Sequence, residues 1–123
     1  MKTALLLIAH GSRNEEANAD LHHLAAALRQ ERTFAVVEAS FLELAGPDID
    51  TGGARCVAEG VERVVLLPYF LSAGVHVRRD LAEARSRLAA RFPHVEFRLA
   101  EPLGRHPRLL DIVTDRAVEA LAV

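Results

Sequence analysis

Four short apolar runs alternate along the chain with longer segments of helical periodicity, and this alternation limits the folds available to it. The runs are Thr3–Ala9, Phe34–Phe41, Val61–Pro68 and Val95–Leu99. The first and third are nearly continuous in Leu, Ile and Val, as is typical of parallel strands covered on both faces. A strand followed by a helix, four times over, predicts a parallel sheet with right-handed crossovers. We therefore expect an α/β, flavodoxin-like three-layer sandwich with a four-stranded parallel sheet in the order 2-1-3-4 and two helices on each face.

The segments after the runs predict four helices. Glu15–Arg32 carries apolar residues at clear helical spacing. Asp48–Glu59 has the weakest pattern, because Gly52 and Gly53 each cost about 1 kcal/mol relative to alanine inside a helix. The last two helices are indicated by apolar residues three or four positions apart: Leu81, Ala84, Leu88 and Phe92, then Leu110, Val113, Ala117 and Leu121.

The composition favours a single globular domain over residues 1–123. Half of the residues are hydrophobic and 26% are charged, a balance typical of folded domains. The formal net charge of −2 gives no basic field, so we expect no nucleic-acid partner. The N-terminal apolar run is too short for a membrane span and lacks the pattern of a signal peptide. The lone Cys56 excludes an internal disulfide and fits a reducing compartment, so we expect a cytoplasmic protein without membrane contact.

Residues capable of chemistry follow the predicted strands directly. His10 follows the first run, Glu43 closes the second apolar stretch, and His76 comes shortly after the third run. The carboxyl ends of parallel strands meet at one edge of the sheet, where open α/β sheets bind their ligands. The three side chains can therefore converge on one site, although a lone histidine at a turn or a glutamate after a strand is often only a surface residue.

Two imidazoles and a carboxylate suit a divalent metal such as cobalt, nickel, iron or zinc. The pattern lacks the clustered Cys and His of a closed structural zinc site, so it fits an open site that hands its metal on. Arginines near the same edge can bind carboxylates through paired hydrogen bonds. These are Arg13, Arg78, Arg79 and Arg105, and the neighbouring Tyr69, Phe70 and Leu71 can provide an apolar floor.

Four motifs, taken together and in order, resemble one known family. They are His10–Arg13, Phe41–Glu43, Pro68–Asp80 and Pro102–Pro107. The chain resembles the small class II chelatases, the short sirohydrochlorin cobaltochelatases and ferrochelatases of cobalamin, siroheme and related tetrapyrrole synthesis. The resemblance covers essentially the whole chain.

The resemblance implies ATP-independent insertion of a divalent metal into sirohydrochlorin, with Co²⁺ as the usual metal, Ni²⁺ or Fe²⁺ as further candidates, and no organic cofactor. It implies that His10, Glu43 and His76 handle the metal, with His10 and His76 as the catalytic residues. The short members of the family act as homodimers, so we expect one here. The residues expected to bind the tetrapyrrole are Arg13, Tyr69, Phe70, Leu71, Ser72, Ala73, Gly74 and Arg78.

Two other functions remain open at this point. One is a phosphoryl-transfer enzyme of the histidine-phosphatase type, which the pair His10-Gly11 with Asn14 faintly resembles; that family places an arginine before its catalytic histidine, where this chain has Ala9. The other is a non-catalytic flavodoxin-like module that binds a ligand or a partner, and it predicts no metal dependence and no tetrapyrrole binding.

Overall fold

The computed structural model describes residues 1–122. Within them, none of the helices combines the length and the apolar character that crossing a membrane requires. Strands and helices alternate strictly along the chain, as the sequence predicts. In order they are β1 (Thr3–Ala9), α1 (Glu15–Glu31), β2 (Val36–Phe41), α2 (Ile49–Ala58), β3 (Arg63–Pro68), α3 (Val75–Arg91), β4 (Glu96–Leu99) and α4 (Arg108–Leu121).

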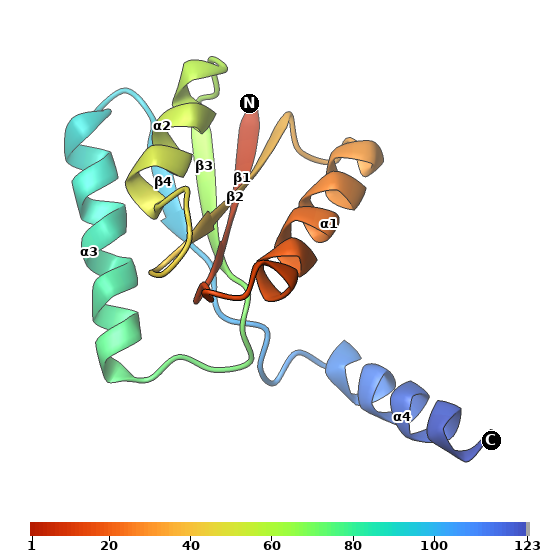
Figure 1. Cartoon of the computed structure of the whole chain (residues 1–123). Coiled ribbons are helices and arrows are strands. Elements are labelled where there is room, and N and C mark those ends of the chain that lie inside the picture. The colour runs from red at the N-terminus through yellow and green to blue at the C-terminus, as the bar shows by residue number, and fades with distance from the viewer. Residues whose placement is uncertain (123) are drawn as a thin grey trace.

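The four strands form one parallel sheet in the order β2-β1-β3-β4, which confirms the predicted topology (Figure 1). Three strands start one or two residues later than their apolar runs. Val61 and Val95, for example, are buried but precede the paired residues of β3 and β4. An apolar run therefore marks where the chain becomes buried, and this point lies slightly before the first residue that pairs with a neighbouring strand.

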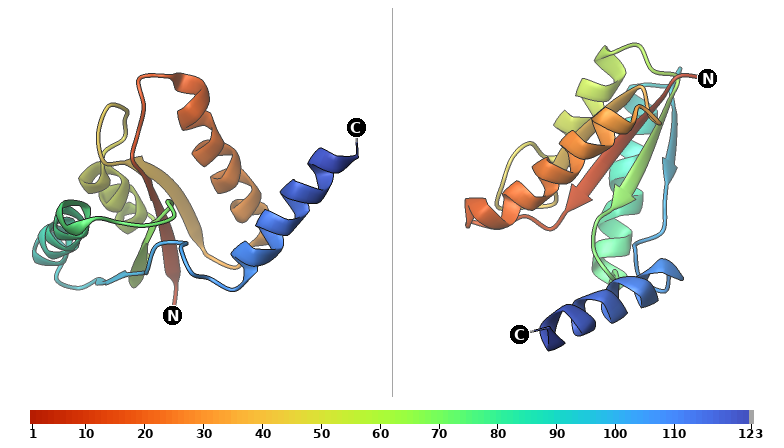
Figure 2. Two further views of the ribbon diagram at one scale, coloured as in Figure 1. Left: turned by 90° about the horizontal axis from the view of Figure 1, so that it is seen from below. Right: turned by 90° about the vertical axis from the view of Figure 1, so that its right-hand side faces the viewer.

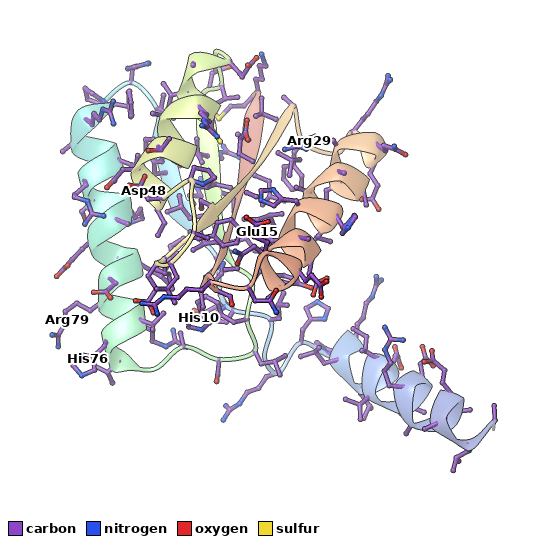
Figure 3. All side chains as sticks on the ribbon, in the orientation of Figure 1. His10, Glu15, Arg29, Asp48, His76 and Arg79 are labelled. Atoms are coloured by element: carbon purple, nitrogen blue, oxygen red, sulfur yellow. The ribbon has the colours of Figure 1, made fainter. Side chains whose placement is uncertain are left out.

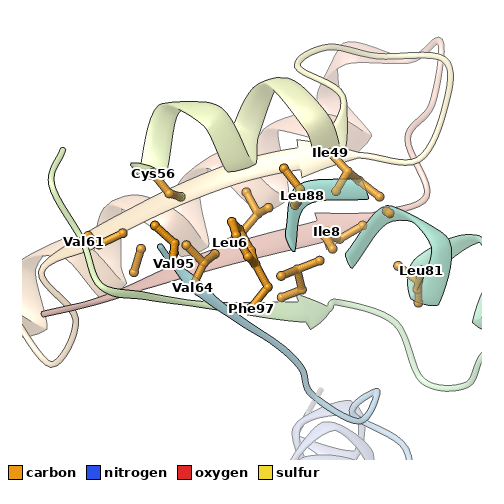
Figure 4. Packing of buried hydrophobic residues seen from close by; sticks show 13 residues of the cluster. Leu6, Ile8, Ile49, Cys56, Val61, Val64, Leu81, Leu88, Val95 and Phe97 are labelled. Atoms are coloured by element: carbon orange, nitrogen blue, oxygen red, sulfur yellow. The ribbon is translucent and has the colours of Figure 1, made fainter. Parts of the chain in front are cut away.

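Alternate residues of the central strands enter two separate cores. On one face, Leu6 and Ile8 of β1 pack with Val64 and Leu66 of β3 beneath α2 and α3 (Figure 4). On the other face, Leu5 and Leu7 belong to the cluster covered by α1. This explains why β1 is apolar at every interior position: each of its faces is buried against helices.

The helix α2 forms despite its two glycines because it packs very close to its neighbours. A β-carbon on Gly52 would lie 2.8 Å from Leu6 Cδ1, and one on Gly53 would lie 2.6 Å from Leu88 Cδ2. The helix start is capped by Asp48, whose side chain accepts a hydrogen bond from the Thr51 N–H at 2.8 Å. This bond lowers the pKa of the Asp48 carboxyl. Tertiary packing and the cap outweigh the low helix propensity of glycine.

The predicted arrangement of two helices on each face is wrong. α2 and α3 cover one face, and α1 alone covers the other. α4 extends away from the sheet, and none of its residues is buried (Figures 1 and 2). Periodicity correctly predicted the helix, but it carries no information about where the apolar stripe of the helix is covered.

Candidate active site at the carboxyl edge of the sheet

His10 stands directly after β1, at the carboxyl end of the central strand. Its imidazole stacks on the ring of Phe70, with ring centroids 4.4 Å apart and planes tilted by 30°. Phe70 follows β3, and the Tyr69 N–H donates to the Ile8 carbonyl at 2.7 Å, which extends the pairing of the two strands up to the site. A solvent-exposed imidazole is thus fixed on one side by an aromatic ring.

The loop after His10 is joined closely to the loop that carries Glu43. The Glu43 N–H donates to the His10 carbonyl at 3.0 Å, and the Leu42 N–H donates to the Ala9 carbonyl at 2.9 Å. Gly11 has a φ of +93°, and a β-carbon there would overlap the carbonyl oxygen of Glu43. Only glycine meets both conditions, because it tolerates positive φ and has no side chain. The backbone therefore sets His10 and Glu43 side by side.

Asn18 holds the same loop from the other side. Its side-chain oxygen accepts a hydrogen bond from the Ser12 N–H at 2.9 Å, and its amide nitrogen donates to the Ser12 carbonyl at 2.7 Å. A single side chain thus satisfies both backbone groups of Ser12. Sequence reasoning missed this residue, because an asparagine in the second turn of a helix gives no signal that it bonds back to the preceding loop.

His10 and Glu43 both line a cavity of about 400 Å³ between the start of α2 and one side of α3. Carboxylates from both helices join them. The acidic lining residues are Glu43, Asp48, Asp50, Asp80 and Glu83, and Arg87 is the one arginine among the lining residues. A wall of this composition attracts cations, and it lies directly beside the exposed imidazole.

His76 shares the edge of the sheet but not this cavity. It lies in the first turn of α3, exposed to solvent, and it does not line the cavity (Figure 3). Within residues 1–122, no group of three His, Cys, Asp or Glu side chains lies close enough to hold a metal ion. The structure thus places His10 and Glu43 on the wall of one cavity, and it leaves His76, the third predicted ligand, outside that cavity.

The predicted tetrapyrrole-binding segment is an exposed loop with apolar side chains. Leu71 is 62% exposed, Tyr69 is 36% exposed, and Val75 at the start of α3 is 71% exposed. Gly74 precedes α3 and offers no capping side chain. Such an apolar surface at the ligand edge of the sheet suits a flat, apolar molecule.

The two arginines among the predicted tetrapyrrole-binding residues differ in their surroundings. Arg78 donates from Nε to the Ala73 carbonyl at 3.2 Å, and its Nη1 lies 3.5 Å from a carboxylate oxygen of Glu101. It therefore connects the loop before α3 to the segment after β4. Arg13 is exposed beside Ser12 and lines a second cavity, of about 650 Å³, at the start of α1. Both side chains are exposed and can meet an incoming anion.

The chain matches one family and several characterised proteins. The model of the CbiX family matches residues 4–120. The sirohydrochlorin cobaltochelatase of Priestia megaterium is 37% identical over 97% of this chain, which corresponds to 39% of the relative. The cobaltochelatase of Sulfolobus acidocaldarius is 33% identical over 97% of this chain and 93% of its own length. The chain thus spans about half or less of the curated relatives that match most strongly, and nearly the full length of the archaeal one.

Solved structures agree with the observed fold. A cobalamin-biosynthesis CbiX protein from Marinobacter aquaeolei superimposes with a TM-score of 0.83, at 34% identity and 97% coverage of both chains. The sirohydrochlorin chelatase SirB of Bacillus subtilis subspecies spizizenii, solved in complex with cobalt, gives a TM-score of 0.88 at 30% identity and covers 97% of this chain and 51% of SirB. With the family match over almost its whole length, the chain belongs to the CbiX family.

Proposed function

We propose that this protein inserts a divalent metal, Co²⁺ foremost, into sirohydrochlorin without ATP. The observation that carries the proposal is the imidazole of His10, stacked on Phe70 at the mouth of an acid-lined cavity. This arrangement occurs in a chain of the CbiX family whose relatives include cobaltochelatases and ferrochelatases. Ni²⁺ and Fe²⁺ suit the same donors, and the choice among the metals does not follow from ligand chemistry alone.

Metal insertion requires a base, because two pyrrole N–H protons must leave the macrocycle. In our proposal His10 accepts protons from the face of the ring that lies over the site. An imidazole can accept a proton and later release it to water. Stacking on Phe70 holds the plane of the imidazole, which reduces the motion that must be frozen in the transition state.

The metal reaches the macrocycle through the donors at the same edge. Glu43 and His10 share the cavity wall and supply a carboxylate and an imidazole, whereas His76 supplies a second imidazole from the first turn of α3. We propose that His76 joins them when the metal and the macrocycle are bound. A set of donors that is incomplete without substrate holds the ion weakly, which suits an ion that must be passed on.

The substrate is flat, and sirohydrochlorin carries eight carboxylates. We propose that its ring lies on the exposed segment formed by Tyr69, Phe70, Leu71, Ser72, Ala73 and Gly74. Its carboxylates bind Arg13 and Arg78 at the rim, since a guanidinium pairs with a carboxylate through two hydrogen bonds. We further propose a homodimer in the cytoplasm, formed of one chelatase-like domain per chain, in which two copies complete the broad cleft.

Neither alternative function gains support. This chain lacks the arginine that the phosphatase type places before its catalytic histidine, because Ala9 ends β1 there, and no contact among the described residues of the site favours a non-catalytic module. Incubation of the protein with sirohydrochlorin and each of Co²⁺, Ni²⁺ and Fe²⁺ tests the proposal, with the visible absorption of the macrocycle as the readout. We expect metal-dependent conversion faster than the protein-free reaction. Binding of sirohydrochlorin without accelerated insertion would favour the non-catalytic module.

A further inference from the structure

A second cavity lies at the same edge of the sheet, beside the start of α1. Its volume is about 650 Å³, and it is bounded by α1 and by the connection between β2 and α2. α1 and α2 cover opposite faces of the sheet (Figure 1), so this cavity and the acid-lined one stand on either side of that connection. The polar residues that line the second cavity are Ser12, Arg13, Glu15, Asn18, His22 and His23.

The two cavities adjoin each other and differ in charge. Glu43 lines the first and Leu44, the next residue, lines the second, so their walls meet within about 4 Å along the backbone. Five carboxylates and one guanidinium line the first cavity. One guanidinium, two imidazoles and a single carboxylate, that of Glu15, line the second. The first cavity therefore suits a cation, and the second suits an anion.

The two imidazoles of the second cavity are carried by a rigid element. His22 and His23 lie in the interior of α1 (Glu15–Glu31). The ring of His22 packs edge-on against the buried Phe41, with centroids 5.6 Å apart and planes at 62°. Successive helical residues point about 100° apart, yet both histidines line this cavity. The cavity is thus broad enough for a ligand group to meet both rings.

The donors in this wall are available to a ligand. Asn18 uses its side chain on both backbone groups of Ser12. By contrast, among residues 1–122 no acceptor bonds to the side chain of Arg13, His22 or His23, and all three are exposed. A neutral imidazole offers one N–H donor, and a guanidinium offers five. Donors of this kind bind carboxylates, which accept hydrogen bonds through both oxygens.

We propose that the second cavity binds carboxylates of the macrocycle, with Arg13, His22 and His23 as the donors. The inference rests on the proposed function, in which the ring lies over His10 and carries eight carboxylates at its rim. Arg13 is three residues from His10, so their Cα atoms are at most about 11 Å apart. A guanidinium pairs with one carboxylate through two hydrogen bonds, so two arginines leave most of the rim without partners. The histidine pair supplies the next donors.

The contrast between the cavities then orients the macrocycle. Rim carboxylates are repelled by the carboxylates of the first cavity and attracted by the donors of the second. The polyanionic rim is therefore held on the α1 side of His10. The acid-lined cavity on the other side stays open to the metal ion, so the two substrates approach the imidazole of His10 from different directions.

Equilibrium binding of sirohydrochlorin in the absence of metal tests the site, with the visible absorption of the macrocycle as the readout. We expect the double variant His22→Ala/His23→Ala to raise the Kd about tenfold, because hydrogen bonds to a charged acceptor are lost. Alanine is a strong helix former and both positions are exposed, so the fold should persist, which circular dichroism checks. His94→Ala is the matched control: His94 is exposed in the turn before β4, lines neither cavity and should leave the Kd unchanged.

A charge series at position 23 separates carboxylate binding from a general effect of the shape of the cavity. His23→Lys keeps a donor and adds a positive charge, so its Kd should stay within about threefold of the wild type. His23→Glu sets a carboxylate against the rim, so its Kd should rise more than that of His23→Ala. Equal Kd values for the lysine and glutamate variants would overturn the carboxylate site.

The Co²⁺ insertion rate of the wild type separates this inference from the proposed function. If the wild type binds sirohydrochlorin without accelerating insertion, the proposed activity fails, whereas a weakened Kd of the double alanine variant still supports the site. If the wild type inserts cobalt and the double variant binds sirohydrochlorin as tightly as the wild type, the site alone is overturned. A wild type that does not bind sirohydrochlorin would overturn both.

Discussion

The surrounding structure holds the two histidines of the candidate site in position to very different degrees. His10 follows a strand buried on both faces, and its loop is held by Gly11, by Asn18 and by the stack on Phe70. His76 lies in the first turn of a helix that begins without a capping side chain and follows an exposed loop. The same residue type is thus rigidly held on one side of the edge and lightly held on the other.

Under the proposed function, this difference suits the two sides to different tasks. A base that must meet a pyrrole proton benefits from a fixed position, because misplacement by about 1 Å can cost a factor of a hundred in rate. A ligand that must bind a metal and then release it benefits from freedom to move. The contrast implies that substitutions around His10 disturb the fold and the reaction together, whereas substitutions at the start of α3 leave the fold intact.

The largest effect is expected for Gly11→Ala. The added methyl group meets the Glu43 carbonyl at a backbone φ of +93°, so we expect a loss of about 3 kcal/mol in the free energy of unfolding. Gly60→Ala is the matched control, since Gly60 has a φ of +78° with nothing within 4 Å of the added carbon. It should cost about 1 kcal/mol. Urea denaturation measures both, and equal losses would show that the two loops are not closely joined.

A smaller effect is expected for Asn18→Ala, which removes both hydrogen bonds to Ser12. We expect a loss of about 2 kcal/mol in the free energy of unfolding and a drop in kcat of roughly fivefold, because the loop carrying His10 loosens. Asn14→Ala removes only the cap of α1, where the side chain accepts from the Glu16 N–H. It should cost about 1 kcal/mol and leave kcat unchanged. Equal kcat values for the two variants would mean that Asn18 has only a structural role.

The smallest effect is expected on the His76 side, for Gly74→Ser. A β-carbon at Gly74 meets nothing within 4 Å, and the new hydroxyl can cap the start of α3. We expect the free energy of unfolding, measured by thermal unfolding, to rise by a few tenths of a kcal/mol. A loss comparable to that of Gly11→Ala would remove the contrast between the two sides.

Sequence patterns predicted the strands and their arrangement in the sheet well, because the apolar runs and their spacing determine which segments are buried. The strand order and the edge position of His10 followed from those runs. The place of α4 did not, because the spacing of Leu110 and Val113 reveals an apolar stripe but not where the helix lies relative to the sheet. The bonds of Asn18 and the separation of His76 from His10 were also beyond prediction, since both depend on how loops close in three dimensions.

His10 and His76 are the residues that we propose carry the metal insertion itself. The most direct test is the initial rate of Co²⁺ insertion into sirohydrochlorin by the wild type, His10→Ala and His76→Ala, with circular dichroism confirming that each is folded. We expect each variant to lose at least about tenfold in rate, roughly 1.4 kcal/mol of barrier. A folded His10→Ala or His76→Ala protein that inserts cobalt at the wild-type rate would contradict the claim.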